Sequence, residues 1–202
     1  MKIICIGHNY LSHIKELGQA IPQKPVFFCK PDSALLLKDR PLYLPDFSNE
    51  IYYETELVVK ICRLGKSIQT AFAHTYYEEI GLGFDFTARD LLQGCVREGL
   101  PWEIAKSFDN SACLGQFIPK SQLSLPNLEF TLEKNGEIVQ VGHASDMVFN
   151  IDQIISYVSQ FMTLKIGDCI FTGTPSGVGK LQIGDQLEAK LNGKKLLSCA
   201  IK

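Results

Sequence analysis

The stretch IYYETELVVKI, residues 51–61, is rich in β-branched and aromatic side chains, a composition that predicts a β-strand. It carries Glu54 and Glu56 two positions apart. Residues two apart in an extended chain point to the same face, so the two carboxylates should lie side by side and repel each other. Either both face solvent on an amphipathic strand, or they share a positively charged partner.

Short strand-like runs dominate the chain on both sides of this stretch. They include KIICIG, PVFFCK, ALLLKD and the hairpin LEFTLEKNGEIVQVG, whose turn is marked by Asn135 and Gly136. The strands do not alternate regularly with helices. We therefore predict a mainly β protein with some α-helix, built as one domain over residues 1–202 from a mixed, largely antiparallel sheet with helices packed outside.

Three segments carry helix signals. The first, residues 9–18, is predicted to begin at Asn9 as N-cap and to end at Gly18. The second follows TARD, where Thr87 and Asp90 have the spacing of a capping box. The third is the amphipathic segment NIDQIISYVSQFMTL. These helices are too few to form a layer of their own.

The overall composition excludes several classes of protein. Of the 202 residues 21% are charged, and the net charge of −2 offers no basic excess for a nucleic-acid partner. No apolar run approaches the about 18 residues of a membrane span, and the N-terminus turns polar too early for a signal peptide. The seven cysteines are widely spaced without a CxxC pair, which is typical of buried, reduced cysteines rather than a disulfide or zinc framework. We expect a cytoplasmic protein.

The glycine-rich stretch GTPSGVGK, residues 173–180, is similar to a phosphate-binding loop but fails its spacing. Thr174 stands where a P-loop needs its first glycine, and Leu181 stands where it needs Ser or Thr. A dinucleotide-binding fingerprint fails as well, because Gln182 replaces its third glycine. The stretch therefore predicts a tight turn and not a nucleotide site.

A third acidic residue gives Glu54 and Glu56 a chemical purpose. Asp85 ends another strand-like run, and its neighbours Phe84 and Phe86 should point to the opposite face. Three converging carboxylates in a partly buried site require a cation. Ligands that are all oxygen favour Mg²⁺, with Mn²⁺ or Ca²⁺ as alternatives. The spacing alone fits a solvated strand face equally well.

Two further residue sets are candidates for catalysis. His13 and Glu16 are three apart in the first predicted helix and share one face, so the carboxylate could orient the imidazole as a general base. The same spacing is also usual on a solvated helix face. Lys106 lies among apolar neighbours in PWEIAKSFD, which by itself marks nothing more than a surface lysine.

Seven stretches in order resemble the fumarylacetoacetate hydrolase family: GHNYLSHIKE, PVFFCKPDSAL, YYETEL, GFDFTARD, GLPWEIAKSFD, NGEIVQVGHASDM and FTGTPSGVG. The resemblance covers residues 2–190 and points to the short members that act as acylpyruvate hydrolases and oxaloacetate decarboxylases. It implies a mixed-sheet β-roll, a homodimer, a Mg²⁺ cofactor and a small 2-oxo acid substrate.

The resemblance also implies a role for each candidate. The expected assignments are Mg²⁺ ligands at Glu54, Glu56 and Asp85; a lysine near the substrate at Lys106; a catalytic pair, His13 and Glu16, on a lid helix over residues 9–18; a substrate carboxylate contact at Thr174; and a further pocket residue at Lys30.

The implied reaction is cleavage of a C–C bond in a 2-oxo acid through a metal-bound enolate, by acylpyruvate hydrolysis or oxaloacetate decarboxylation. A tautomerase, isomerase or decarboxylase of the 2-hydroxyhepta-2,4-diene-1,7-dioate type needs the same enolate and is the alternative. Three residues depart from the family pattern, namely His8 for arginine, Leu92 for glutamine and Ala144 for threonine. These departures leave open an inactive relative that only binds metal or ligand.

Overall fold

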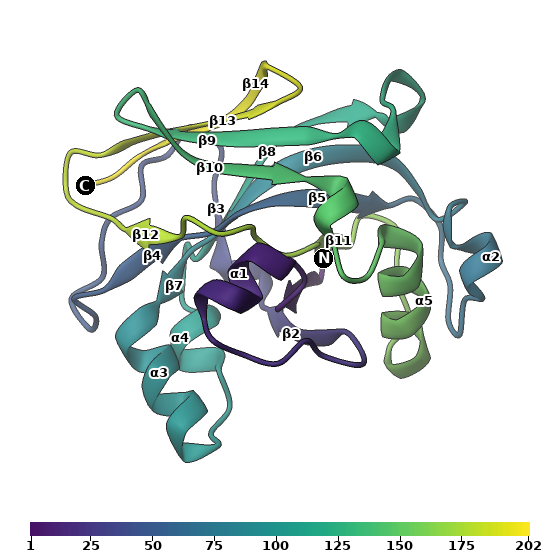
Figure 1. Ribbon diagram of the computed structural model, residues 1–202, viewed down its shortest axis with the longest axis horizontal. Helices are drawn as coiled ribbons and strands as arrows, with labels where there is room; N and C mark the ends of the chain where they lie inside the picture. Colours follow the sequence, from purple (N-terminus) through teal and green to yellow (C-terminus); the bar gives the residue numbers. More distant parts are fainter.

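Strand β5, Thr55–Ile61, lies in the middle of the largest sheet of the computed structural model, which describes residues 1–202 (Figure 1). This sheet has seven strands in the order β2 (Val26–Lys30), β1 (Ile3–Gly7), β11 (Cys169–Phe171), β5, β6 (Tyr77–Asp85), β8 (Ala112–Pro119) and β3 (Leu35–Leu36). Two pairs, β1 with β11 and β3 with β8, are parallel, and the others are antiparallel. The predicted mixed, largely antiparallel sheet is therefore confirmed.

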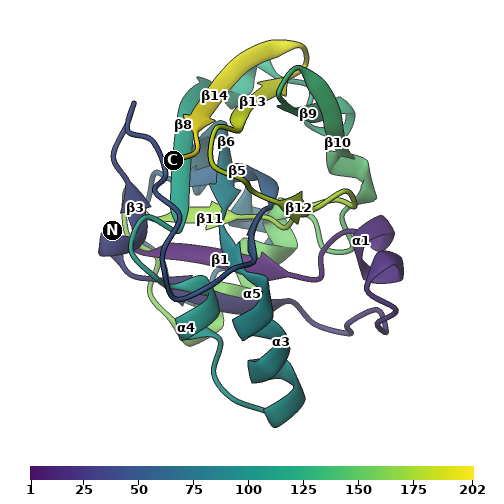
Figure 2. The ribbon, with the colours of Figure 1, turned by 90° about the vertical axis from the view of Figure 1, so that its left-hand side faces the viewer.

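Two smaller sheets complete the β-structure. One has four strands in the order β10 (Glu137–His143), β9 (Glu129–Lys134), β13 (Gln186–Leu191) and β14 (Lys194–Ala200). The other has three short strands in the order β12 (Gly179–Lys180), β4 (Ile51–Tyr53) and β7 (Thr87–Ala88). Figure 2 shows the four-stranded sheet arching over the seven-stranded sheet, as in a half-open roll.

The core divides between the two faces of the seven-stranded sheet. The main cluster of 37 buried residues includes Leu57, Val59 and Ile61 of β5, together with residues of the four-stranded sheet. A second cluster of six buried residues covers the opposite face and includes Val58 of β5. Because side chains alternate along a strand, Glu54 and Glu56 share the face of Val58. This face is covered too, so their strand is buried on both sides.

The helices lie outside the sheets (Figure 1). The α-helices are α1 (Leu11–Glu16), α2 (Thr70–Ala73), α3 (Arg89–Glu98), α4 (Glu103–Lys106) and α5 (Ile151–Phe161), and the short 3₁₀ turns are η1 (Asp32–Ala34), η2 (Lys120–Gln122), η3 (Leu125–Asn127) and η4 (Ala144–Asp146). No helix has the length and apolar character that a bilayer crossing demands. The prediction of a mainly β fold with a few peripheral helices is confirmed.

Two of the predicted helix starts are wrong. Helix α1 begins at Leu11 and not at Asn9, whose side-chain amide instead donates to the carbonyls of Phe149 and Thr172. No capping box starts α3 either, because Thr87 lies in a strand and its hydroxyl donates to Glu54. In both cases a distant buried partner displaces the local cap.

The other turn and cap signals agree with the structure. Gly18 and Gly99, which follow the ends of α1 and α3, have φ of 63° and 68°, the left-handed conformation that favours glycine at a helix end. Asn150 caps α5 through a bond from the Gln153 N–H. Asn135 and Gly136 form the turn between β9 and β10. These signals depend on neighbours in sequence alone, and for that reason they are readable from the sequence.

Candidate active site

The register between β5 and β6 brings the acidic residues together. Thr55 lies opposite Phe84, and Glu56 lies opposite Gly83. One step further along, the Asp85 N–H donates to the Glu54 carbonyl at 2.9 Å. The strand pairing therefore places the Asp85 side chain next to that of Glu54 and diagonally across from that of Glu56.

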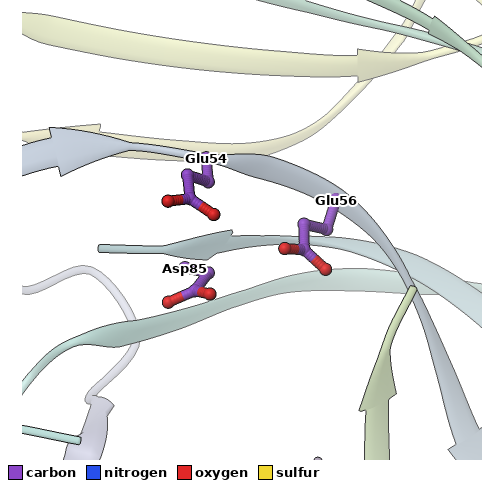
Figure 3. Close-up of side chains that lie close together, drawn as sticks. All are labelled: Glu54, Glu56 and Asp85. Carbon is purple, nitrogen blue, oxygen red and sulfur yellow. The ribbon is translucent and has the colours of Figure 1, made fainter. Parts of the chain in front are cut away.

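The three carboxylates form a buried cluster. Glu54, Glu56 and Asp85 are 7%, 1% and 1% exposed, and one carboxylate oxygen of each lies within 4.8 Å of the others. Figure 3 shows the three side chains projecting from two neighbouring strands toward the same side. The alternative that Glu54 and Glu56 face solvent is therefore wrong. Phe84 and Phe86 belong to the main core on the opposite face, as their positions predict.

Two buried lysines partly balance this negative charge. The Lys106 ammonium, at the end of α4, lies 3.0 Å from Glu54 and 2.8 Å from Asp85. The Lys30 ammonium, at the end of β2, lies 2.8 Å from Asp85 Oδ1 and also donates to the Ser111 carbonyl. The interpretation of Lys106 as an ordinary surface lysine is wrong, because only 4% of it is exposed. Two ammonium groups against three carboxylates leave one negative charge uncompensated.

The pKa values show where that charge is least tolerated. Burial raises the pKa of Glu56 well above its ordinary value, and the charges of Asp85 and Glu54 raise it further. At Glu54 burial also favours the neutral acid, but the Lys106 ammonium outweighs it and lowers the pKa. Burial opposes the charge on Lys106, yet Asp85 and Glu54 raise its pKa. Glu56 is therefore the member of the cluster without an ammonium partner.

The cluster fits a hard divalent cation. Its ligand atoms are all carboxylate oxygens, which Mg²⁺ and Mn²⁺ prefer, and they converge within the reach of one ion. Asp85 Oδ1 is buried and accepts no well-aligned hydrogen bond, although Lys30 lies near it as a charge partner. A cation at this point would oppose the repulsion that raises the pKa of Glu56.

Helix α1 brings the other predicted pair to the same region. His13 is buried, and its Nδ1 lies 2.9 Å from Glu16 Oε2. The second Glu16 oxygen accepts the Gly177 N–H at 3.3 Å, and the Ser12 hydroxyl accepts the Ser176 N–H at 3.3 Å. The solvated-face alternative is wrong for His13, and α1 is docked onto the glycine-rich loop.

This loop, residues 172–177, joins the cluster through its backbone. The Gly173 N–H donates to Glu56 Oε2 at 2.6 Å. Gly173 has φ of 102°, and a Cβ there would lie 2.8 Å from the Cβ of Asn9, so this position accepts only glycine without a shift. The buried Thr174 follows, and its hydroxyl donates to the Thr55 carbonyl at 2.9 Å. The loop is thus fastened directly to the strand that carries Glu54 and Glu56.

A cavity of about 250 Å³ opens above the cluster. Predicted site residues on its wall are His13, Glu54, Asp85, Lys106 and Thr174. Glu56 and Lys30 lie behind this wall, because neither is among the lining residues. The structure therefore brings the predicted residues into one region but divides them between the cavity surface and a buried layer.

The basic and amide residues of the cavity wall were not among the residues predicted from the sequence. Arg89, Gln93 and Arg97 line it from α3. Their spacing of four residues places them on one helix face, and this signal was available in the sequence. Thr87, which donates to Glu54 at 2.8 Å and accepts from Lys106 at 2.6 Å, was mistaken for a capping residue.

Two of the three departures from the family pattern also line the cavity. His8 has φ of 55°, and its ring packs edge-on against that of Trp102, with 6.3 Å between the two ring centroids. Its buried Nδ1 has no hydrogen-bond partner. Burial and the neighbouring His13 charge lower the pKa of His8, which favours a neutral ring. Leu92 adds an apolar side chain to the wall, whereas Ala144 begins η4 and is not part of it.

Known proteins match this chain over nearly its whole length. The family model described as fumarylacetoacetate (FAA) hydrolase C-terminal matches residues 2–201. The Bos taurus protein named oxaloacetate tautomerase FAHD1, mitochondrial, is 41% identical over 192 residues, which cover 95% of this chain and 87% of the relative. The Escherichia coli K12 protein named oxaloacetate tautomerase YcgM is 41% identical over 200 residues, covering 96% and 90%.

A solved structure shares the fold over the whole of this chain. Fumarylpyruvate hydrolase from Pseudomonas aeruginosa, in complex with Mn²⁺ and pyruvate, superposes with a TM-score of 0.92 at 33% identity, covering 100% of this chain and 89% of that chain. The shared architecture includes every element that carries the carboxylate cluster, the two lysines and the cavity wall.

Proposed function

The chain belongs to the fumarylacetoacetate hydrolase family, and from this premise we propose that it is a metal-dependent enzyme acting on small 2-oxo acids, with keto–enol tautomerisation of oxaloacetate as its reaction. One observation carries the proposal: three buried carboxylates converge, and two of them, Glu54 and Asp85, line a cavity that also receives His13. The relatives named oxaloacetate tautomerases support this choice over the cleavage reactions that the resemblance first suggested.

The carboxylate cluster is the proposed metal site. Glu54, Glu56 and Asp85 would hold Mg²⁺ or Mn²⁺, which when bound supplies a Lewis acid for the keto and carboxylate oxygens of the substrate. Lys106, whose ammonium lies beside Glu54 and Asp85 on the cavity wall, would add a second positive charge at this site. The Mn²⁺ and pyruvate of the Pseudomonas aeruginosa structure support a metal and a 2-oxo acid in this fold.

His13 is the proposed proton carrier. The Glu16 carboxylate accepts from Nδ1, so it favours the tautomer that carries its proton there and leaves Nε2 free. Nε2 would accept a proton from the substrate carbon beside the keto group and return it in the reverse direction. The keto oxygen gains a proton in a second transfer to give the enol, so tautomerisation demands proton transfers at carbon and at oxygen but no attacking water.

The cavity wall suits a dicarboxylic acid. Arg89 and Arg97 supply positive charge from α3, and His8 and Gln93 supply neutral hydrogen-bonding groups. We propose Arg89 as a carboxylate ligand because guanidinium pairs with carboxylate in a fixed, bidentate geometry. Thr174 stays a candidate for the other carboxylate, as the resemblance implies, through its backbone N–H, because its hydroxyl donates to the Thr55 carbonyl.

Cleavage of an acylpyruvate is the second candidate function. The same pair, His13 and Glu16, would then activate a water for attack on the distal carbonyl. The fumarylpyruvate hydrolase with the same fold favours this reaction. Oxaloacetate decarboxylation belongs with it, since both release pyruvate.

The test separates these reactions by product. Purified protein is supplied with oxaloacetate or acetylpyruvate, with Mg²⁺, with Mn²⁺ or with EDTA. Faster loss of the enol absorbance of oxaloacetate, without pyruvate release, supports tautomerisation; pyruvate release, followed by a coupled dehydrogenase, supports cleavage. Absence of both on every 2-oxo acid would favour a relative that only binds metal or ligand.

The assembly and the compartment are part of the proposal. We propose a homodimer in the cytoplasm, and the seven free cysteines suit a reducing compartment. Light scattering on the purified protein measures the assembly, and a mass of one chain at micromolar concentration would reject the dimer.

A further inference from the structure

Gln140 lies on β10 of the four-stranded sheet, a strand that carries none of the residues assigned to the site so far. Only 1% of it is exposed. The pairing of β10 with β9 shifts register between Ile138 and Gln140, which marks a β-bulge. Bulges redirect a side chain out of the regular alternation and are frequent beside functional sites. Here the bulge aims a buried amide at the seven-stranded sheet.

The amide of Gln140 joins two segments of the candidate site. Its Oε1 accepts the Thr55 N–H at 3.1 Å, and its Nε2 donates to the Thr174 hydroxyl at 3.0 Å and to the Pro175 carbonyl at 3.1 Å. Both amide hydrogens and the amide oxygen are thus engaged. Thr55 is the residue between Glu54 and Glu56, and Thr174 and Pro175 belong to the loop on the cavity wall.

Thr174 closes the connection. Its hydroxyl accepts from Gln140 and donates to the Thr55 carbonyl at 2.9 Å. Both backbone groups of Thr55 are therefore held, the N–H by Gln140 and the carbonyl by Thr174. Since its hydrogen is committed to Thr55, the Thr174 hydroxyl has none to offer a substrate carboxylate in this arrangement.

The loop also rests directly on the bulge. A Cβ at Gly177 would lie 2.3 Å from the Val139 carbonyl, which is the backbone next to Gln140. Gly177 has φ of 92°, a conformation that favours glycine. The bulged backbone supports the loop at Gly177, and the Gln140 side chain holds the same loop at Thr174 and Pro175.

We propose that Gln140 is a positioning residue that holds the Glu54–Glu56 strand and the Thr174 loop in fixed register. The hydrogen bonds reach both segments from a third strand, so Gln140 contacts neither cation nor substrate. Its effects on kinetics and on cation affinity rest on the proposed function, whereas its effect on the backbone does not.

The test compares Gln140→Met with Gln116→Met. Gln116 is an exposed strand residue whose side chain makes no hydrogen bond within the chain. Its substitution therefore makes the same side-chain change without breaking a hydrogen bond. Hydrogen exchange is measured by mass spectrometry on peptides covering residues 51–57 and 172–178. Mn²⁺ affinity is measured by the spin-resonance signal of free Mn²⁺, and KM and kcat are measured on oxaloacetate.

Gln140→Met should raise exchange in both peptides, and weaken Mn²⁺ binding and raise KM by about tenfold, with a smaller change in kcat. Gln116→Met should leave all of these values as in the unchanged protein. A lower Tm with unchanged exchange in the two peptides, unchanged Mn²⁺ affinity and unchanged KM would overturn the proposal, because Gln140 would then only fill the core.

Two further outcomes are kept apart. If the unchanged protein turns over no 2-oxo acid, the proposed function fails, and the exchange measurement still decides the role of Gln140. If Gln140→Met does not fold, Thr174→Val removes one of its three bonds. The proposal then predicts faster exchange over residues 172–178, and exchange equal to that of the unchanged protein would reject it.

Discussion

Asp85 and Glu54 lie opposite each other across the β5–β6 pair and share one ammonium group. The Asp85 N–H donates to the Glu54 carbonyl at 2.9 Å, and the Lys106 ammonium lies 2.8 Å and 3.0 Å from their carboxylates. The same backbone bond that sets the strand register therefore sets the spacing of the two acids. Glu56 completes the cluster without an ammonium partner, which makes it the most informative residue to change.

Substitution of Glu56 by Gln should stabilise the metal-free protein and weaken its cation binding. Above the raised pKa of Glu56 the change removes a charge that is buried beside two others, so at such a pH we expect a gain of about 1 kcal/mol and a Tm rise of about 2–4 °C. Mn²⁺ should at the same time lose its stabilising effect. Scanning calorimetry with and without Mn²⁺ measures both, with the exposed Glu137→Gln as the control. A lower Tm in the metal-free variant would contradict the assignment.

The pH dependence of stability follows from the same residue. The folded-state pKa of Glu56 is raised above that of the unfolded chain, which is about 4.3, so the folded state binds the proton more tightly. This contribution is fully present below the unfolded pKa and is lost as the pH rises through the raised folded pKa. Urea unfolding of the metal-free protein from pH 4.5 upward should therefore show a loss of stability that Glu56→Gln abolishes. An identical pH profile for both proteins would count against a protonated Glu56.

Substitution of Lys106 by Met should be costly without metal. It leaves the buried carboxylates of Glu54 and Asp85 without the Lys106 ammonium. Breaking a buried ion pair in this way lowers the free energy of unfolding by about 3–5 kcal/mol. Added Mn²⁺ should restore part of this loss because it replaces the missing positive charge. Lys60→Met, which breaks a half-exposed pair with Glu79, should cost less than about 1 kcal/mol. Equal losses in the two variants would show that Lys106 is not coupled to the cluster.

Substitution of His13 by Ala should separate chemistry from metal binding. Loss of a general base lowers kcat by about 10²–10⁴-fold, while Mn²⁺ affinity should stay within about twofold because His13 is outside the carboxylate cluster. Glu16→Gln should lower kcat less, since Nε2 of His13 remains in place. Collapse of Mn²⁺ binding in His13→Ala would reassign His13 to the metal site.

The sequence predicts the features that depend on neighbouring residues. The strand over 51–61, the turn at Asn135 and the shared face of Glu54 and Glu56 all follow from alternation and turn chemistry. Burial of that face does not, because alternation gives the same pattern for a solvated face. The ordered set of family-like stretches pointed to the metal site, and the structure supplies the covering layer.

Polar residues with distant partners were out of reach of the sequence. Asn9 and Thr87 both have good local capping roles, worth about 1 kcal/mol each. In the fold their hydrogen bonds go instead to buried groups more than thirty positions away, such as the Thr172 carbonyl and the Glu54 carboxylate. The role of Gln140 could not be predicted for the same reason, since its partner Thr55 is 85 positions away in the sequence.

The central claim is that Glu54, Glu56 and Asp85 hold one divalent cation that the reaction of a 2-oxo acid requires. The most direct test is a Mn²⁺ titration, followed by the spin-resonance signal of free Mn²⁺, of the unchanged protein and of Asp85→Asn, with oxaloacetate turnover recorded at each point. We predict one Mn²⁺ per chain, turnover that rises with its occupancy, and loss of both in Asp85→Asn. Turnover that persists after complete metal removal, or unaltered Mn²⁺ binding in Asp85→Asn, would contradict the claim.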